Sequence, residues 1–572
     1  MRTKREPSGI FATRFSFPIA RPVTVILCFT ALSTKAEGFF GFFIFFAFSR
    51  CGRMSFLPFQ LRTDFGMALS SVQFDDLLVK KKKIQYNIPV PRKKVNSMAF
   101  ESITYSGICK YKDIDFTFIF SGEELRLVPP ADKREIIQTD WVLTPLTKGV
   151  YTRGDPLTMD EPYLTGKCNE TGTTFIFITK QGGHVGSQNS VLFVPIVAYI
   201  RCRHGRDSIA RMSFTSPVIN CIHPVNQGFG YAIDVDSFNE TGVFTVTTQS
   251  FDETTTESQT FMVDNIQVSV EFSISRKLST KLNEPPITLS SSMLFEFAPT
   301  NDYRFIFRLW SVAKQFLQYL CYRRNIFLPE VALSAPADGG KYEEFATMYV
   351  LNEAGDDESS TLKSGRYIQQ KYLAGTEGKI LSDIASGMLY LRHLPQTYQS
   401  GRTIDAARFI MITAAFEWEY KRNFPDGVPK KEARLKAEAA VTDEIDEKIK
   451  SSAGKKREIY KFLKRLVKSD SLESEIIHTG KVIDDIIGVF GKHLYHLNGE
   501  ELKYSEMGKR LSSQRNHYAH GDLDQEFIGL SLLDLMYMEY VLYAIQLNYY
   551  GIDEKNIRRA INDLFHLNYA IT

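Results

Sequence analysis

The spacing of apolar residues changes from every second position to every third or fourth near the middle of this 572-residue chain, and no other feature limits the fold as much. Residues 267–274 alternate between polar and apolar side chains, which predicts a β-strand with one buried face. In residues 303–324 the apolar side chains mostly recur every three to four positions, which predicts a helix. The sequence therefore predicts a β-rich part followed by a helical part.

The β-rich part is built from short apolar runs separated by turn-type segments rich in Gly, Asn and Asp. Further runs of this kind lie at residues 175–178, 191–200, 243–246 and 293–297. Many short strands with no long helix between them are typical of a sandwich or an open barrel. We assign residues 98–334 to a β-rich sensor or regulatory domain that ends in a connecting helix.

The last part of the chain has helical periodicity from about residue 371 onward. Residues 335–404 are interpreted as a linker and helical connection, and residues 405–572 as an antiparallel helical bundle. Asp524 is expected to cap the first turn of a long helix over residues 524–549, because an aspartate oxygen accepts from free backbone N–H groups. The predicted fold class is therefore α+β, with a β-rich domain before an all-α bundle.

The first 97 residues differ from the rest in composition. Two apolar runs, at residues 23–32 and 39–48, are shorter than the ~20 residues that a spanning helix needs. A signal peptide and a basic arm around residues 80–83 are alternative interpretations. The favoured interpretation is a disordered segment, or upstream sequence before a true start at a later methionine such as Met98.

Composition limits the partners and the compartment. The net charge of +3 is nearly neutral for this length, so any nucleic-acid site must be a local patch. The seven cysteines are widely spaced and none forms a C-x-x-C pair, which favours buried or free thiols in a reducing compartment. We expect a cytoplasmic protein with no stable membrane insertion, no cofactor and no metal.

The main candidate for chemistry is the string RNHYAH at residues 515–520. Arg515 is a permanent cation that can hold phosphate oxygens, and His520 can exchange protons near neutral pH. This pair suits RNA cleavage by the RNA's own 2′-hydroxyl, with His520 moving a proton and Arg515 stabilising the transition-state charge. Asn516 is the third catalytic candidate, as a donor to the phosphate or as a group that orients the His520 ring.

The spacing of the two residues has a geometric consequence. If the preceding helix continues through the string, Arg515 and His520 lie about one and a half turns apart, on adjoining faces. They would not form one compact site on one chain. Two chains related by a two-fold axis could bring two arginines and two histidines into one cleft.

Other residues were weighed as site candidates. His493 and His496 have a spacing that can bind a metal, but no third ligand is evident and ordinary histidines are favoured. Glu417 or Glu419, beside Trp418, could orient a catalytic arginine or histidine, although glutamates on helix surfaces are common.

Residues 405–567 resemble the HEPN domains, a helical superfamily of metal-independent ribonucleases whose signature is Arg, four to six residues and then His, often with a polar residue after the Arg. The string at residues 515–520 meets this signature. The layout after Met98 resembles the ApeA branch, which has a β-rich domain, a connecting element (here residues 305–324 with 326–333) and a C-terminal HEPN domain. Some HEPN toxins carry a modifiable tyrosine two residues after the His, and this chain has Asp522 there.

The resemblance implies an endoribonuclease that acts on single-stranded or looped RNA, pairs as a homodimer through its helical domain, and takes part in abortive infection against phage. It also implies that an unidentified ligand or phage protein triggers the β-rich domain. The alternative is a non-catalytic dimerisation or RNA-binding module with a ligand-binding β-domain. A weaker alternative is a secreted β-sandwich binding protein.

Overall fold

The computed structural model describes residues 104–351 and 365–571, except 149, 154–156, 204–207, 233, 235–237, 240 and 244, together with four strands before residue 61. The chain divides into two compact units, residues 1–95 and 96–572. In the first unit four strands pair in chain order into an antiparallel sheet: β1 (Ala12–Phe15), β2 (Val25–Thr30), β3 (Phe43–Arg50) and β4 (Arg53–Gln60). Most of residues 1–97 lie outside the described residues, so the interpretation of this segment remains a prediction.

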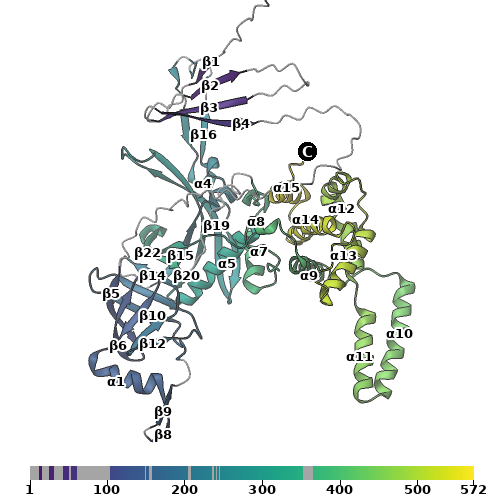
Figure 1. The fold of residues 1–572 in the computed structure, drawn as a ribbon, viewed down its shortest axis with the longest axis horizontal. Coiled ribbons are helices and arrows are strands. Elements are labelled where there is room, and N and C mark those ends of the chain that lie inside the picture. The colour runs from purple at the N-terminus through teal and green to yellow at the C-terminus, as the bar shows by residue number, and fades with distance from the viewer. Residues whose placement is uncertain are drawn as a thin grey trace, which may run out of the picture. The chain divides into compact units, whose positions relative to one another are not determined.

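The second unit begins with one large antiparallel sheet of fourteen strands (Figure 1). Among the described strands, the two at the ends of the order do not pair with each other, so the sheet is open. In sheet order the strands are β12 (Gly186–Gln188), β13 (Val191–Val194), β7 (Leu125–Val128), β6 (Ile114–Phe120), β5 (Tyr105–Tyr111), β10 (Tyr163–Cys168), β11 (Thr174–Thr179), β14 (Ile196–Cys202), β22 (Tyr342–Val350), β21 (Glu330–Pro336), β15 (Ile209–Thr215), β20 (Ile287–Thr300), β19 (Ile266–Leu278) and β18 (Gln259–Val263).

The alternating pattern that predicted a half-buried strand is confirmed in β19. Its apolar residues Val268, Val270, Phe272 and Ile274 are buried, while the residues between them are more exposed. β19 pairs with β20 over most of its length, from Val268 opposite Phe297 to Leu278 opposite Ile287. Alternation shows that one face is buried but not which strands pair, so the single continuous sheet is a finding of the structure.

The sheet continues past residue 334, where the sequence placed the end of the β-rich domain. β21 and β22 lie side by side within the sheet, between β14 and β15. Residues 326–333, expected to follow the connecting helix, therefore lead into a strand. A short apolar run cannot be assigned to a buried strand or a helix from its periodicity alone, which explains the difference.

Two smaller hairpins and several short helices complete the β-rich part. The hairpins are β8 (Leu143–Thr147) with β9 (Val150–Arg153), and β16 (Phe229–Ala232) with β17 (Thr245–Thr248). The short helices are α1 (Arg134–Ile136), α2 (Ile219–Ile222) and α4 (Phe251–Thr254).

The connecting helix is confirmed as α5 (Tyr303–Cys321). The Asp302 carboxylate caps it by accepting from the N–H groups of Arg304 and Phe305. The helix ends at Tyr322, which has a φ of +51° and so turns the chain out of the helical path. The buried face of α5 packs into the hydrophobic core that the second half of the sheet shares with the bundle.

The remaining described helices form the C-terminal helical part (Figure 1). α9, α12, α13 and α14 pack against one another, and α15 packs on α12 and α14. The helices are α7 (Glu377–Ser386), α8 (Tyr398–Gly401), α9 (Ala406–Asn423), α10 (Glu432–Ser451), α11 (Gly454–Lys468), α12 (Leu472–His496), α13 (Tyr504–Ala519), α14 (Ser531–Tyr549) and α15 (Glu554–Phe565).

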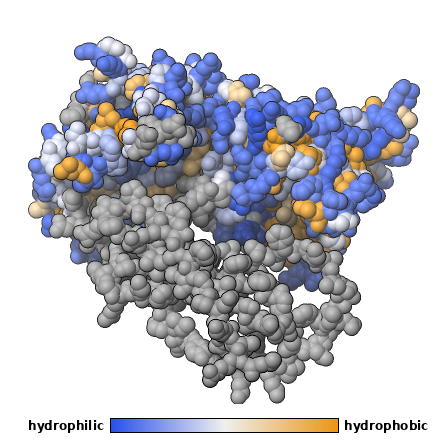
Figure 2. All heavy atoms as spheres, turned by 90° about the horizontal axis from the view of Figure 1, so that it is seen from above, coloured by the Kyte–Doolittle hydropathy of each residue, from blue (hydrophilic) through white to orange (hydrophobic). Residues whose placement is uncertain are grey.

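The helices α10 and α11 form a hairpin that extends away from the bundle (Figure 1). α10 buries none of its side chains. On α11 the large apolar residues Ile459, Phe462 and Leu466 are more than half exposed. The coloured part of the surface in Figure 2 is mainly hydrophilic, with hydrophobic side chains exposed in separate patches.

The base of this hairpin is closed by Asp470. Its carboxylate accepts from the N–H of Val428 at 2.9 Å and lies 3.5 Å from the Lys430 ammonium. The two ends of the hairpin therefore meet, and a short linker can replace it.

We expect that replacing residues 431–469 by a four-residue Gly-Ser linker leaves the rest of the fold intact, because the hairpin adds little to the shared core. The midpoint of thermal unfolding, followed by circular dichroism, should move by less than about 4 °C. Leu535→Ala, in the buried face of α14, serves as the positive control and should cost about 2–5 kcal/mol. A larger fall in the midpoint of thermal unfolding for the linker variant than for Leu535→Ala would contradict the expectation.

Candidate active site

The string at residues 515–520 forms the C-terminal end of α13. The helix runs through Ala519, and His520 is its C-terminal cap residue, with its N–H donating to the carbonyl of Asn516 at 3.0 Å. Because the helix continues through the string, Arg515 and His520 are separated by about 140° around its axis. The side chains of Asn516 and His520 are exposed and that of Arg515 is half-buried.

The loop after the string is fixed by a buried glutamine of α13. Gln514 accepts at Oε1 from the N–H of Ile528 at 2.7 Å and from the hydroxyl of Ser531 at 3.3 Å. Its Nε2 donates to the carbonyl of Glu526 at 3.3 Å. These bonds hold the chain before Ser531 out of helical conformation.

The expectation that Asp524 caps the helix over residues 524–549 was therefore wrong. α14 begins at Ser531, and Leu530 precedes it without a side-chain cap. Gly529, with a φ of +52°, makes the turn into the helix. An aspartate signals a helix start only when no stronger partner holds the backbone after it, and here Gln514 is that partner.

Tyr518 anchors the string from inside. It is buried, its ring packs against Phe409 and Phe527, and its hydroxyl donates to the carbonyl of Gln525 at 3.0 Å. The neighbouring His517 is exposed, with Nδ1 at 3.4 Å from a carboxylate oxygen of Asp522. With Tyr518 turned inward, the rest of the string lies at the protein surface.

Arg515 forms an ion pair with Glu417 of α9. Its Nη2 lies 3.2 and 3.4 Å from the two carboxylate oxygens, and 39% of the Arg515 side chain is exposed. Glu417 therefore has the position that the sequence suggested for a residue that orients the catalytic arginine. The half-exposed guanidinium can also reach an anion from solvent.

Glu419, weighed together with Glu417, points elsewhere. It is fully buried and accepts from the N–H of Tyr390 at 2.9 Å and from the amide of Gln546 at 3.1 Å. Its second oxygen lies 3.1 Å from Arg422. These contacts join α9 to α14 and to the segment before α8, which is a structural role.

Glu475 of α12 is the residue that sequence reasoning missed. It is 4% exposed, and its Oε2 has no hydrogen-bond partner among the described residues. Burial raises the pKa of the Glu475 carboxyl to about 7, and the negative charge of Glu417 adds to this, while Lys421 and Arg515 act in the opposite direction. A carboxyl with a pKa near neutral can both give and take a proton.

The sequence held one signal for Glu475. It stands at helical spacing from the apolar or small residues Leu472, Thr479 and Ile483, so helical periodicity places this glutamate on the inner face of α12. Acidic residues in the first turn of a helix are usually explained by their favourable interaction with the helix dipole. For this reason Glu475 does not stand out in the sequence.

The structure thus brings Arg515, Glu417 and Glu475 together from three helices. It does not bring His520 to this group within one chain, because no described side-chain contact joins His520 or Asn516 to it. The hydrogen bond between Asn516 and His520 is a backbone bond, so the amide of Asn516 does not orient the His520 ring in this structure.

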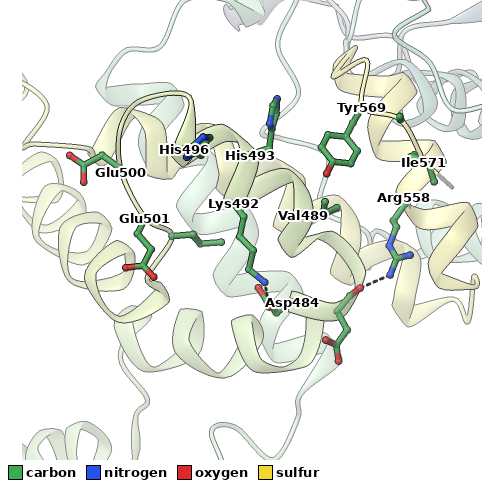
Figure 3. Close-up of a pocket in the computed structure, with 13 residues that line it drawn as sticks. Asp484, Val489, Lys492, His493, His496, Glu500, Glu501, Arg558, Tyr569 and Ile571 are labelled. Atoms are coloured by element: carbon green, nitrogen blue, oxygen red, sulfur yellow. Dashed lines mark hydrogen bonds and ion pairs between the residues drawn. The ribbon is translucent and has the colours of Figure 1, made fainter.

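The two other histidines lie beside a surface hollow between α12 and the end of the chain (Figure 3). The ring of His493 lies 5.5 Å from that of Tyr569, and Lys492 pairs with Asp484 at 2.8 Å. Within the described ranges, no three His, Cys, Asp or Glu side chains are grouped so that they could hold a metal ion. The side chains of His493 and His496 are both exposed.

No family model, no curated protein and no solved structure matches this chain. Within the described part, no helix is both long and apolar enough to cross a bilayer. No disulfide bond joins the described cysteines Cys109, Cys168, Cys202, Cys221 and Cys321 to one another.

We expect the pH dependence of the free energy of unfolding to report the burial of the Glu475 carboxyl. Ionisation of Glu475 is unfavourable only in the folded state, because its pKa rises from an ordinary 4.5 to about 7. The wild type should therefore lose stability as pH rises between these values, and Glu475→Gln should not. The free energy of unfolding of Glu475→Gln minus that of the wild type should be about 3 kcal/mol larger above pH 7 than at pH 4. Urea unfolding at both pH values measures this.

Glu473→Gln is the matched control, because it removes a carboxylate from the same turn of α12 at a less buried position. An equal pH-dependent gain for Glu473→Gln would assign the effect to overall charge. The absence of any gain for Glu475→Gln would show that this carboxyl ionises without cost.

Proposed function

We propose that this protein is a metal-independent endoribonuclease of the HEPN type, with the layout of the ApeA branch. The observation that carries the proposal is the string at residues 515–520, which ends a helix of a C-terminal bundle with Arg515 and His520 open to solvent. The large antiparallel sheet before the bundle supports the domain order of that branch. Its location in the cytoplasm and its role in defence against phage follow from the resemblance and belong to the proposal.

The reaction is transphosphorylation within the RNA. The 2′-oxygen loses its proton and forms a bond to phosphorus, the bond from phosphorus to the 5′-oxygen breaks, and that oxygen gains a proton. His520 transfers protons, and the Arg515 guanidinium stabilises charge on the phosphoryl oxygens. The products carry 2′,3′-cyclic phosphate and 5′-hydroxyl ends.

Two chains are needed for a complete site. On one α13, Arg515 and His520 point about 140° apart, too far around the axis to contact one phosphate. A two-fold axis beside the exposed end of α13 places the arginine of one protomer near the histidine of its partner. We therefore propose a homodimer through the helical part, with the site in the cleft between the two bundles.

Glu417 positions Arg515 before RNA arrives. A half-exposed ion pair is weak, so a phosphate can take over the guanidinium at little cost. Asn516, exposed next to Arg515, donates to the phosphate. Single-stranded or looped RNA is the substrate class, because its backbone can reach the in-line geometry of the attack.

Cleavage of a labelled structured RNA in the presence of EDTA tests the proposal. His520→Ala and Arg515→Ala should each lower the rate at least about 100-fold, because each removes a group that acts in the transition state. The matched control is His496→Ala, which removes an exposed histidine from α12 and should leave the rate unchanged. Circular dichroism and sedimentation should show that the fold and the dimer persist.

Products with 3′-hydroxyl ends would exclude this mechanism. Equal rates for the wild type and His520→Ala would assign any cleavage to another site. RNA binding without cleavage by all variants would favour a non-catalytic RNA-binding module.

A further inference from the structure

A pocket of about 300 Å³ that opens to solvent lies where the connecting helix meets the bundle. It is bounded by the end of α5, by α8, and by α14 and α15, so it touches both the β-rich and the helical parts. It is separate from the candidate active site, whose residues do not line it. A cavity of this size can hold one small molecule.

Aromatic rings form part of the wall. Tyr540 of α14 and Phe565 of α15 lie with ring centres 4.7 Å apart, and Tyr398 of α8 lines the same cavity. Tyr540 is buried and the other two are half-buried, so flat apolar surface faces the cavity. Such surfaces favour a planar aromatic ligand.

Two arginines give the cavity a positive charge. Arg366 lies with its guanidinium carbon 4.2 Å from the centre of the Tyr398 ring, and Arg402 is exposed near the same tyrosine. Within the described ranges, no ion pair joins either arginine to a carboxylate. Two guanidinium groups without anionic partners, one of them stacked on an aromatic ring, favour a ligand with a phosphate or carboxylate group.

A buried carboxylate closes the inner side. Glu539 accepts at Oε1 from Arg408 at 2.6 Å and from the hydroxyl of Tyr322. Both Glu539 and Arg408 have side chains that are only 10% exposed. No described residue donates a hydrogen bond to the other oxygen of Glu539, which leaves an acceptor for an amino group of a ligand.

We propose that this cavity binds a nucleoside monophosphate. The phosphate contacts Arg366 and Arg402 at the mouth, the base stacks among the aromatic rings, and an amino group of the base donates to Glu539. Each part of the ligand matches a feature of the wall. Arg366 and Arg402 have no ion pair among the described residues, the aromatic rings give a flat apolar surface, and one oxygen of Glu539 accepts no hydrogen bond from a described residue.

The position of the cavity connects it to the candidate active site. Arg408, which holds Glu539, lies on α9, and the same helix carries Glu417, the partner of Arg515. Tyr322, the other partner of Glu539, directly follows α5. A ligand here would therefore affect the contact between the connecting helix and α9, and this regulatory consequence rests on the proposed function.

Isothermal titration calorimetry of the full chain with AMP, GMP, CMP and UMP tests the binding. At least one nucleotide should bind with one site per chain, and Arg402→Ala should weaken it at least tenfold, about 1.4 kcal/mol. Arg402 is exposed and has no ion pair within the described ranges, so its loss should not disturb the fold. The matched control is Arg457→Ala on the exposed α11, which should bind as the wild type does.

Two further sets of titrations distinguish binding in this pocket from binding at the RNA site. The parent nucleoside and inorganic phosphate should each bind more weakly than the nucleotide, because each lacks half of the contacts. Arg515→Ala should leave the affinity unchanged. If Arg515→Ala weakens binding and Arg402→Ala does not, the nucleotide occupies the RNA site and the proposal is overturned. If none of the four nucleotides binds at about 1 mM, the proposed nucleotide site is also overturned. Neither outcome changes the test of the proposed ribonuclease function, which is the loss of RNA cleavage in His520→Ala.

Discussion

A single hydrophobic core joins the second half of the large sheet to the helical bundle, and the position of every candidate site residue depends on it. Side chains from β15, β19 and β20 belong to the same buried cluster as side chains from α5, α9, α12 and α14. Tyr319 of α5 and Tyr543 of α14 show the contact directly, with stacked rings 5.0 Å apart and a hydrogen bond of 2.8 Å from the Tyr543 hydroxyl to the Tyr319 carbonyl. Residues 96–572 accordingly form one compact unit.

The bundle carries buried charges, and the fully buried carboxylate of Asp534 is paired. Asp534 of α14 accepts two hydrogen bonds from Arg510 of α13, at 2.7 and 2.8 Å, and a third from Tyr495 of α12. A buried carboxylate is costly unless it is paired, so this contact favours one arrangement of the three helices. α12 and α13 also approach closely at Gly480, where a Cβ would lie 2.4 Å from the Tyr504 ring. These contacts fix the start and the middle of α13 against its neighbours.

Much of the fold could be predicted from the sequence, because periodicity reports which face of an element is buried. The strand β19, the connecting helix α5 and the helical character of the last part of the chain were predicted in this way. The strands β21 and β22 and the start of α14 were not. Their conformations depend on partners distant in sequence, such as β14, β15 and Gln514.

The sequence by itself determined that Arg515 and His520 cannot meet if one helix carries both, because the rise and rotation of a helix are fixed. The structure shows that α13 carries both. Only the tertiary structure decided what surrounds them. The ion pair from Arg515 to Glu417, the high pKa of Glu475 and the cavity beside Glu539 each require helices from separate parts of the chain to pack together. Helix packing depends on the fit of whole side-chain surfaces, and local sequence patterns do not encode that fit.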